Sequence, residues 1–269
     1  MWIVVIILAI FSISEISFFI ANVAKIEKRW MFLIFEFAII FTMYVWYRAR
    51  KVINRFEQFV SLKEQIPLLS DLSSDTSIPK FASNLIYLTK ANNRHEVEDK
   101  IIYSIFSRQP KRADTYWFIH IDRTNEPYTL EYSVDELVNE KIIRVEFRMG
   151  FRVQARVSVL FRKVVEEMVA RQELNLNSPY PSLKKYSLSS NFRFVIMEKF
   201  LSYENEFTLA DGFILQSYFA IKRLAQSDAK AFGLDTSDTR IEKIPLVINP
   251  VSELKIKRIA PRKMQKEYA

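Results

Sequence analysis

The sequence contains no cysteine, only two histidines and only three glycines, and each scarcity excludes a class of site. Without cysteine the chain forms no disulfide, zinc ribbon or thiol-based catalytic centre, which fits a reducing compartment. Two histidines, His95 and His120, are too few for a histidine-based metal site. The glycines are Gly150, Gly212 and Gly233, too far apart to build a glycine-rich phosphate loop.

Long apolar runs are confined to the first 47 of the 269 residues. As helices, residues 2–24 would extend about 35 Å and residues 30–47 about 27 Å, long enough to cross a hydrocarbon core. The short polar turn KIEKR separates the two runs, and tryptophan and tyrosine lie near their ends, as is typical of membrane interfaces. A basic start and a small-residue cleavage site, which mark secretory signals, are missing. The sequence therefore predicts two transmembrane helices within residues 1–50.

Three polar side chains, those of Glu15, Asn22 and Glu36, interrupt the predicted spans. A charged side chain at mid-bilayer costs about 2.5 to 3.5 kcal/mol even on lenient insertion scales. Either each carboxyl group is neutral and hydrogen-bonded to a neighbouring helix, or it has a functional role such as supporting a proton path. Two interpretations of the spans stay open: a helical hairpin that only anchors a soluble domain, or polar groups that face protein which two helices by themselves do not supply.

The net charge of +8 and the pI near 9.4 favour contact with an anionic membrane leaflet. Nucleic acid is not expected as a partner, because the basic residues are scattered among acids until the C-terminus. The positive-inside rule compares the turn with the exit of the second span, and it favours a cytoplasmic exit by one charge. We expect a multi-pass protein of the cell membrane with its C-terminal domain in the cytoplasm. The compared cations are Lys25, Lys28 and Arg29 in the turn and Arg48, Arg50, Lys51 and Arg55 at the exit.

Beyond the spans, hydrophobic periodicity predicts a helical stalk over 51–65, an α/β domain over 66–250 and a basic tail over 251–269. The expected fold is a two-helix transmembrane hairpin followed by a cytosolic α/β domain, a mixed sheet with flanking helices. The pattern does not predict strand order. Strands are expected within 85–89, 115–121, 126–134, 141–150, 191–202 and 243–250, helices within 96–108, 156–172 and 208–233, and a linker over 174–191.

Arginines are dense between residues 144 and 162, and guanidinium groups bind phosphates in a bidentate manner. We therefore consider an anionic-ligand cluster, with the alternative that these arginines form a solvated strand face paired with nearby glutamates. No catalytic constellation and no calcium-loop spacing is present, so no catalytic residue, metal site or cofactor is predicted. We expect His120, between two isoleucines, to be a hydrogen-bonded core residue. The cluster comprises Arg144, Arg148, Arg152 and Arg162.

Two groups of motifs resemble the KUP/HAK/KT family of potassium uptake permeases. The first group resembles the family's last two transmembrane helices and consists of Glu15, Phe18, Phe19, Ala21, Asn22 and Lys25, followed by Trp30, Met43, Trp46, Arg48 and Arg50. The second group, KRADTYWF, EPYT and VEFRMGFR, resembles the family's cytosolic C-terminal domain. The chain departs from the family at Glu15, where aspartate is usual, and at Lys28 and Arg29, where two glycines are usual.

The resemblance implies the C-terminal portion of a proton-coupled potassium uptake transporter, whether truncated or split, and no enzyme. Potassium and protons would be the transported species, but no residue here matches a potassium ligand of the family, whose ion site lies in earlier spans. The implied partners are membrane lipid, the missing N-terminal permease bundle, a second copy bound through the cytosolic domain, and the messenger cyclic di-AMP, which controls some permeases of this kind.

A different class of function stays open at this stage. The arginine cluster alternatively suggests a membrane-anchored, nucleotide-sensing regulatory module without transport activity. A membrane-anchored enzyme is the least favoured reading, because no recognisable catalytic site accompanies the anchor.

Overall fold

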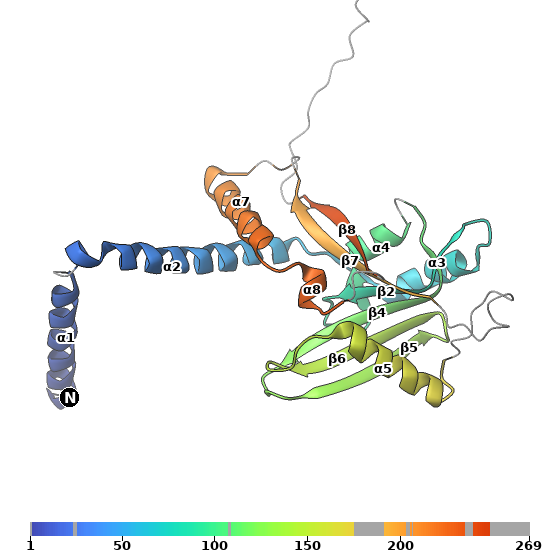
Figure 1. Ribbon diagram of the computed structural model, residues 1–269, viewed down its shortest axis with the longest axis horizontal. Helices are drawn as coiled ribbons and strands as arrows, with labels where there is room; N and C mark the ends of the chain where they lie inside the picture. Colours follow the sequence, from blue (N-terminus) through green and yellow to red (C-terminus); the bar gives the residue numbers. More distant parts are fainter. Residues whose placement is uncertain are drawn as a thin grey trace, which may run out of the picture.

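The computed structural model describes residues 2–23, 26–106, 109–174, 191–202, 205, 207–234 and 239–247. Two long helices, α1 (Trp2–Val23) and α2 (Ile26–Arg55), precede an α/β domain (Figure 1). Most of the predicted linker over 174–191 and all of the predicted basic tail lie outside the described residues.

Both N-terminal helices are long and apolar enough to cross a membrane, over Val4–Val23 and Trp30–Arg55. Their mean hydropathies are 2.5 and 1.6, and almost none of the apolar surface of either span is covered by the rest of the protein. In Figure 1, α1 runs across the direction of α2 and away from the domain. The two helices therefore leave their apolar side chains to an environment that the described residues do not provide.

The stalk differs from the prediction. Helix α2 continues as far as Arg55, but the chain then forms the short strand β1 (Phe59–Ser61) before helix α3 (Leu62–Ser74). Strand β1 pairs antiparallel with β3 (Glu96–Glu98), and the Gln58 carbonyl accepts a hydrogen bond of 3.0 Å from the Asp99 amide. Backbone partners distant in sequence thus replace the helical bonds that local periodicity predicts over 51–65.

Six strands form the main sheet in the order β5-β6-β4-β2-β7-β8. Only β5 runs antiparallel to its neighbour, and the other pairs are parallel. After β2, the chain forms β4, β5 and β6 on one side of β2. It then crosses to the other side of β2, where it forms β7 and β8. The strands are β2 (Lys80–Thr89), β4 (Arg112–Thr124), β5 (Leu130–Val138), β6 (Ile142–Gly150), β7 (Phe192–Leu201) and β8 (Thr239–Leu246).

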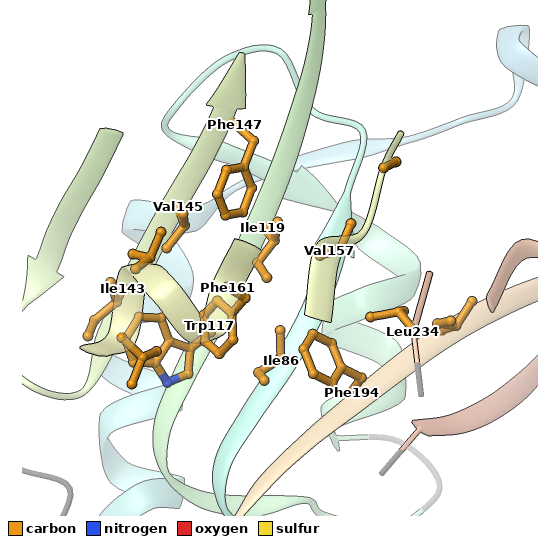
Figure 2. Close-up of a cluster of buried hydrophobic side chains, with 14 of the residues drawn as sticks. Ile86, Trp117, Ile119, Ile143, Val145, Phe147, Val157, Phe161, Phe194 and Leu234 are labelled. Carbon is orange, nitrogen blue, oxygen red and sulfur yellow. The ribbon is translucent and has the colours of Figure 1, made fainter. Parts of the chain in front are cut away.

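Helices cover both faces of this sheet. Helix α5 (Val157–Ala170) packs on one face, where Phe161 meets Trp117 edge to face at 5.1 Å between ring centroids (Figure 2). Helices α3 and α4 (Asp99–Phe106) pack on the other face. Strand β4 is buried on both sides, which explains why its sequence is a nearly continuous apolar run instead of an alternating one.

Helix α7 (Leu209–Leu224) leaves the sheet and packs against α2. The predicted single helix over 208–233 is interrupted: Ala225 is extended, and Ser227 caps a second short helix, α8 (Asp228–Ala231), by accepting a hydrogen bond from the Lys230 amide. The predicted stop at Gly233 is confirmed by its φ of +60°, a left-handed conformation that glycine adopts without steric cost.

Candidate functional site at the junction of stalk and sheet

The order of the strands predicts a ligand site at the carboxyl ends of β2 and β7. Strands β4 and β6 lie on one side of β2, and β7 and β8 lie on the other, so the winding direction reverses between β2 and β7. In open parallel sheets, ligands bind outside the carboxyl ends of the strands at such a reversal, because the flanking loops diverge there and leave a crevice.

A cavity of about 450 Å³ lies at this reversal, and we name it the junction cavity. Its floor comprises the carboxyl ends of β2, β4 and β7, with Thr89, His120 and Lys199 among the lining residues. The C-terminal part of α2 lines it through Trp46, Arg50 and Asn54, and α7 and α8 close its side with Tyr218, Phe219, Lys222 and Asp228. The cavity therefore lies between the spanning helix and the sheet.

The lining of the junction cavity is predominantly cationic. Five lining side chains carry a positive charge at neutral pH and two carry a negative charge. Lys222 pairs with Asp228 at 3.1 Å. His120 is buried, as predicted, with Nδ1 3.2 Å from the Thr89 carbonyl oxygen. The charged lining residues are Arg50, Lys90, Lys100, Lys199 and Lys222, with Glu98 and Asp228.

The carboxylate of Glu57 forms ion pairs with three of the lysines in this lining. It accepts hydrogen bonds of 2.7 Å from Lys100 Nζ and 2.8 Å from Lys199 Nζ, and Lys90 Nζ lies 3.9 Å away. The Glu57 side chain is only 7% exposed, so the ion pairs are shielded from bulk water. Two residues after the end of α2, Glu57 joins the stalk to α4 and β7 at once.

Opposing effects determine the ionisation of this group. Burial of the Glu57 carboxylate acts to raise its pKa, but attraction to Lys100 and Lys90 and the lysine hydrogen bonds outweigh burial and lower the pKa to about 2. Burial and repulsion from Lys100 lower the pKa of Lys199, against the stabilising contact with Glu57. Glu57 is therefore ionised at neutral pH, and the lysines around it repel one another.

A second buried carboxylate, Glu98, ties the end of β2 to α4. It accepts a hydrogen bond of 2.6 Å from the Thr89 hydroxyl and one of 2.9 Å from the Lys90 amide. Its other neighbour is Lys100, at 3.7 Å. Because Lys100 contacts both Glu57 and Glu98, the two carboxylates form one connected charge network.

Arg144 of β6 fixes the loop after β2 by donating hydrogen bonds to its backbone carbonyl oxygens. The guanidinium donates to the carbonyl oxygens of Ala91 at 2.6 Å, Glu96 at 2.9 Å and Arg94 at 3.3 Å. Burial lowers the pKa of Arg144. Arg144 is 1% exposed and organises the loop beside the junction cavity. The same loop also contacts the start of α3, where the Leu62 amide donates a hydrogen bond of 2.7 Å to the His95 carbonyl oxygen.

The structure does not gather the four predicted arginines into one site. Arg144 is occupied by backbone carbonyls, Arg148 is exposed and pairs with Glu131 at 3.1 Å, and Arg152 donates to the Tyr128 hydroxyl at 3.0 Å. Arg162 is exposed on α5, on the opposite face of the sheet from Arg144. Arg144 and Arg148 therefore have protein partners, and Arg162 lies apart from both.

The predicted intramembrane polar residues lie on the exposed surfaces of the two long helices. Glu15 and Asn22 are exposed on α1 and Glu36 is exposed on α2. Among the described residues, no group of three histidine, aspartate or glutamate side chains is placed to hold a metal ion.

Sequence reasoning missed Glu57, Lys90, Lys100 and Lys199 because they are spread over more than half of the domain. A usable signal exists for two of them: Lys90 immediately follows an apolar strand, and Lys199 lies near the end of another. Polar residues at the carboxyl ends of parallel strands are candidates for a ligand site. Strand order, which the sequence pattern does not supply, is needed to bring them together.

A family model described as the K+ potassium transporter C-terminal domain matches residues 82–256. A probable potassium transport system protein Kup from Cytophaga hutchinsonii is 44% identical over 259 residues, covering 96% of this chain and 39% of the relative. The Kup protein of Flavobacterium johnsoniae is 40% identical over 94% of this chain and 38% of its own length. One from Clostridium perfringens is 32% identical over 96% and 39%. No solved structure matches.

Proposed function

This chain belongs to the Kup potassium transporter family, whose C-terminal domain matches most of it, and we propose that it forms the membrane-anchored C-terminal part of a potassium uptake transporter. One observation carries the proposal. Two helices of membrane-spanning length and the family's C-terminal domain occur together in a chain that spans 39% of the length of a Kup relative. Transport then requires the remaining part of such a transporter.

The proposal includes the ions and the orientation. Potassium is the transported ion in the names of the relatives. The family resemblance supports proton coupling, which we include in the proposal. Glu15 and Glu36 would face the neighbouring helices of the transporter, because an acid at that depth needs a partner. The cations that follow the apolar run of α2, among them Arg48 and Arg55, support a cytoplasmic location of the domain beside the cell membrane.

The junction supports a regulatory role for the domain. Helix α2 is continuous from the span to Arg55, and Glu57 immediately beyond it is held by lysines from the β2 loop, α4 and β7. A shift of the sheet edge would therefore be transmitted to the spanning helix by packed and charge-paired contacts. In this proposal the domain regulates transport and provides contacts to a second copy.

Complementation of potassium uptake tests the transport proposal. Cells without potassium uptake systems would express this chain, an N-terminal fragment of a Kup relative, or both, and grow at limiting potassium. We expect growth only with both pieces. Growth with this chain alone would contradict the proposal, as would failure of both pieces to support growth while they co-purify as a folded complex.

A second candidate function is favoured by the junction cavity itself. Its volume of about 450 Å³ lies in the range of small-molecule sites, and its lysines are suited to a phosphate-bearing anion. We propose this cavity, in place of the dispersed arginines, as the site of the nucleotide-sensing alternative, with cyclic di-AMP as the probe. A bound phosphate would compete with Glu57 for Lys100 and Lys199.

Calorimetry with the full chain in detergent tests the second candidate. Cyclic di-AMP is titrated into the unsubstituted chain, Lys199→Met and the matched control Arg162→Met, whose arginine is exposed on α5. We expect binding that is weakened at least tenfold by Lys199→Met and unchanged by Arg162→Met. Absence of binding at high micromolar cyclic di-AMP, or equal loss in both variants, would contradict a nucleotide site in this cavity.

A further inference from the structure

Helix α7 carries apolar side chains on both of its long faces. Its inner face packs on α2 through Leu215 and Tyr218, which contact a cluster that includes Val45, Ala49 and Ile53. Its outer face carries four exposed apolar side chains, which we name the outer stripe, and the exposed Gln216 lies between them. The outer stripe consists of Leu209, Phe213, Ala220 and Leu224.

Such a surface is unusual for a helix in contact with water. A surface helix of a globular domain normally has a polar outer face, whereas Leu209 is 96% exposed, Phe213 is 59% exposed and Leu224 is 91% exposed. No acidic side chain lies among the exposed residues of α7, because Asp211 is partly buried. The outer stripe therefore requires an apolar environment to be stable.

The position of α7 along α2 indicates which environment this is. The ring of Phe213 lies 6.1 Å from that of Phe41, and the ring of Tyr218 lies 5.1 Å from that of Trp46. Helix α7 therefore crosses α2 obliquely, with Phe213 in its N-terminal half beside the apolar run of α2 and Tyr218 closer to the cations of α2 (Figure 1). Phe41 precedes Arg48, the first cation after the apolar run, by seven residues, which is about 10 Å along a helix.

Cations also lie near the C-terminal end of the same helix. Lys222 and Arg223 lie in the last turn of α7, Lys222 lines the junction cavity together with Arg50 of α2, and α2 carries further cations on either side of Arg50. We name this group the basic collar. It comprises Arg48, Arg50, Lys51, Arg55, Lys222 and Arg223. An apolar stripe on the membrane side of such a collar is the arrangement of an interfacial helix, which buries its apolar face about 5 to 10 Å below anionic headgroups.

We propose that α7 is an interfacial membrane helix that inserts the outer stripe into an anionic bilayer beside α2, with the basic collar at the headgroups. The insertion is shallow at Leu224 and deepest toward Leu209 and Phe213. It anchors the domain to the membrane at a second place, adjacent to the junction cavity, which Tyr218 and Lys222 of the same helix line. The proposal is independent of whether the chain takes part in potassium transport.

Site-directed spin labelling tests this directly, because the chain has no native cysteine. Single substitutions Phe213→Cys and Leu224→Cys are labelled in the full chain reconstituted into phosphatidylcholine–phosphatidylglycerol nanodiscs. Phe37→Cys on the α2 span, 69% exposed, is the membrane reference, and Phe151→Cys after β6, 63% exposed, is the water reference. Circular dichroism and size-exclusion profiles verify that each labelled chain is folded.

The readout is the ratio of accessibility to oxygen, which partitions into lipid, over accessibility to a water-soluble nickel chelate. We expect the ratio at Phe213→Cys to approach that at Phe37→Cys and to exceed that at Phe151→Cys several-fold, with Leu224→Cys in between. A ratio at Phe213→Cys equal to that at Phe151→Cys would overturn the proposal. So would an immobilised label shielded from both reagents, which would mean that protein covers the stripe.

Discussion

The carboxylate of Glu57 lies 2.8 Å from the ammonium of Lys199, although 142 residues separate them in the sequence. This contact joins the segment that directly follows α2 to strand β7. The ammonium of Lys100, in α4, donates a second hydrogen bond of 2.7 Å to the same carboxylate. The stalk and the domain are thus connected by charge as well as by the backbone.

Replacing Glu57 removes the anion that three lysines share. We expect Glu57→Gln to lower the free energy of unfolding by about 3 kcal/mol, because breaking a buried ion pair leaves uncompensated charge. Urea denaturation of the full chain in detergent, followed by circular dichroism, measures the loss. The matched control is Glu131→Gln, whose pair with Arg148 is more than half exposed and is worth about 0 to 1 kcal/mol. Equal losses in both variants would contradict a special role for Glu57.

The same carboxylate makes stability dependent on pH in acid. Its folded-state pKa of about 2 is below the ordinary 4.5, so its contribution is fully present above about pH 4.5 and is lost as the pH falls toward 2. We expect the free energy of unfolding to decrease more steeply between pH 4.5 and 2 in the unsubstituted chain than in Glu57→Gln. Urea titrations at several pH values measure both slopes, and parallel curves would refute the assignment.

Arg144 holds the loop over residues 91–96 through three carbonyl oxygens. Lysine keeps the charge but lacks the planar fork, so Arg144→Lys is expected to lose at least one charged hydrogen bond, worth about 1.5 to 3 kcal/mol. Amide hydrogen exchange in this loop should then accelerate about tenfold or more. Arg152→Lys, at an exposed arginine, is the control and should leave the loop unchanged. Unchanged exchange in both variants would contradict the role of Arg144.

Phe161 is expected to dominate the packing of α5 on the sheet. Its ring contacts Trp117 and Phe194, which Figure 2 labels, and also Phe192, at centroid distances of 5.1 to 5.8 Å. Phe161→Ala should cost about 3 to 5 kcal/mol of unfolding free energy, measured by urea denaturation. Val159→Ala on the same helix, 48% exposed, should change it by about 0.5 kcal/mol or less. A similar cost for both would mean that α5 is not docked as described.

Two glycines respond in opposite directions to alanine. A Cβ at Gly150 would lie 2.5 Å from the Glu126 carbonyl oxygen and the Pro127 backbone, so Gly150→Ala should destabilise by about 1 to 3 kcal/mol. A Cβ at Gly212, within α7, meets only Phe207 Cβ at 3.5 Å, so Gly212→Ala should stabilise by about 0.5 to 1 kcal/mol. Thermal unfolding of both variants measures the signs, and a shared sign would contradict the geometry.

Local patterns predicted most elements of this fold. The expected spans, the strands around Trp117 and Val145, and the helix containing Phe161 all occur, because period and apolar content depend on near neighbours. The helical stalk over 51–65 and the unbroken helix over 208–233 were wrong in part. In the first case strand β3 supplies distant backbone partners, and in the second Ser227 starts a new helix.

By itself, the sequence determined the two membrane-length helices, the mixed α/β character of the domain and membership in a transporter family, because these depend on residue type and local order. Only the tertiary structure decided that Glu57 meets Lys199, that Arg144 holds a loop and stands apart from Arg162, and that α7 returns to α2. The reason is physical. Strand order and helix docking bring together residues far apart in the chain, and electrostatic and packing energies depend on distance in space.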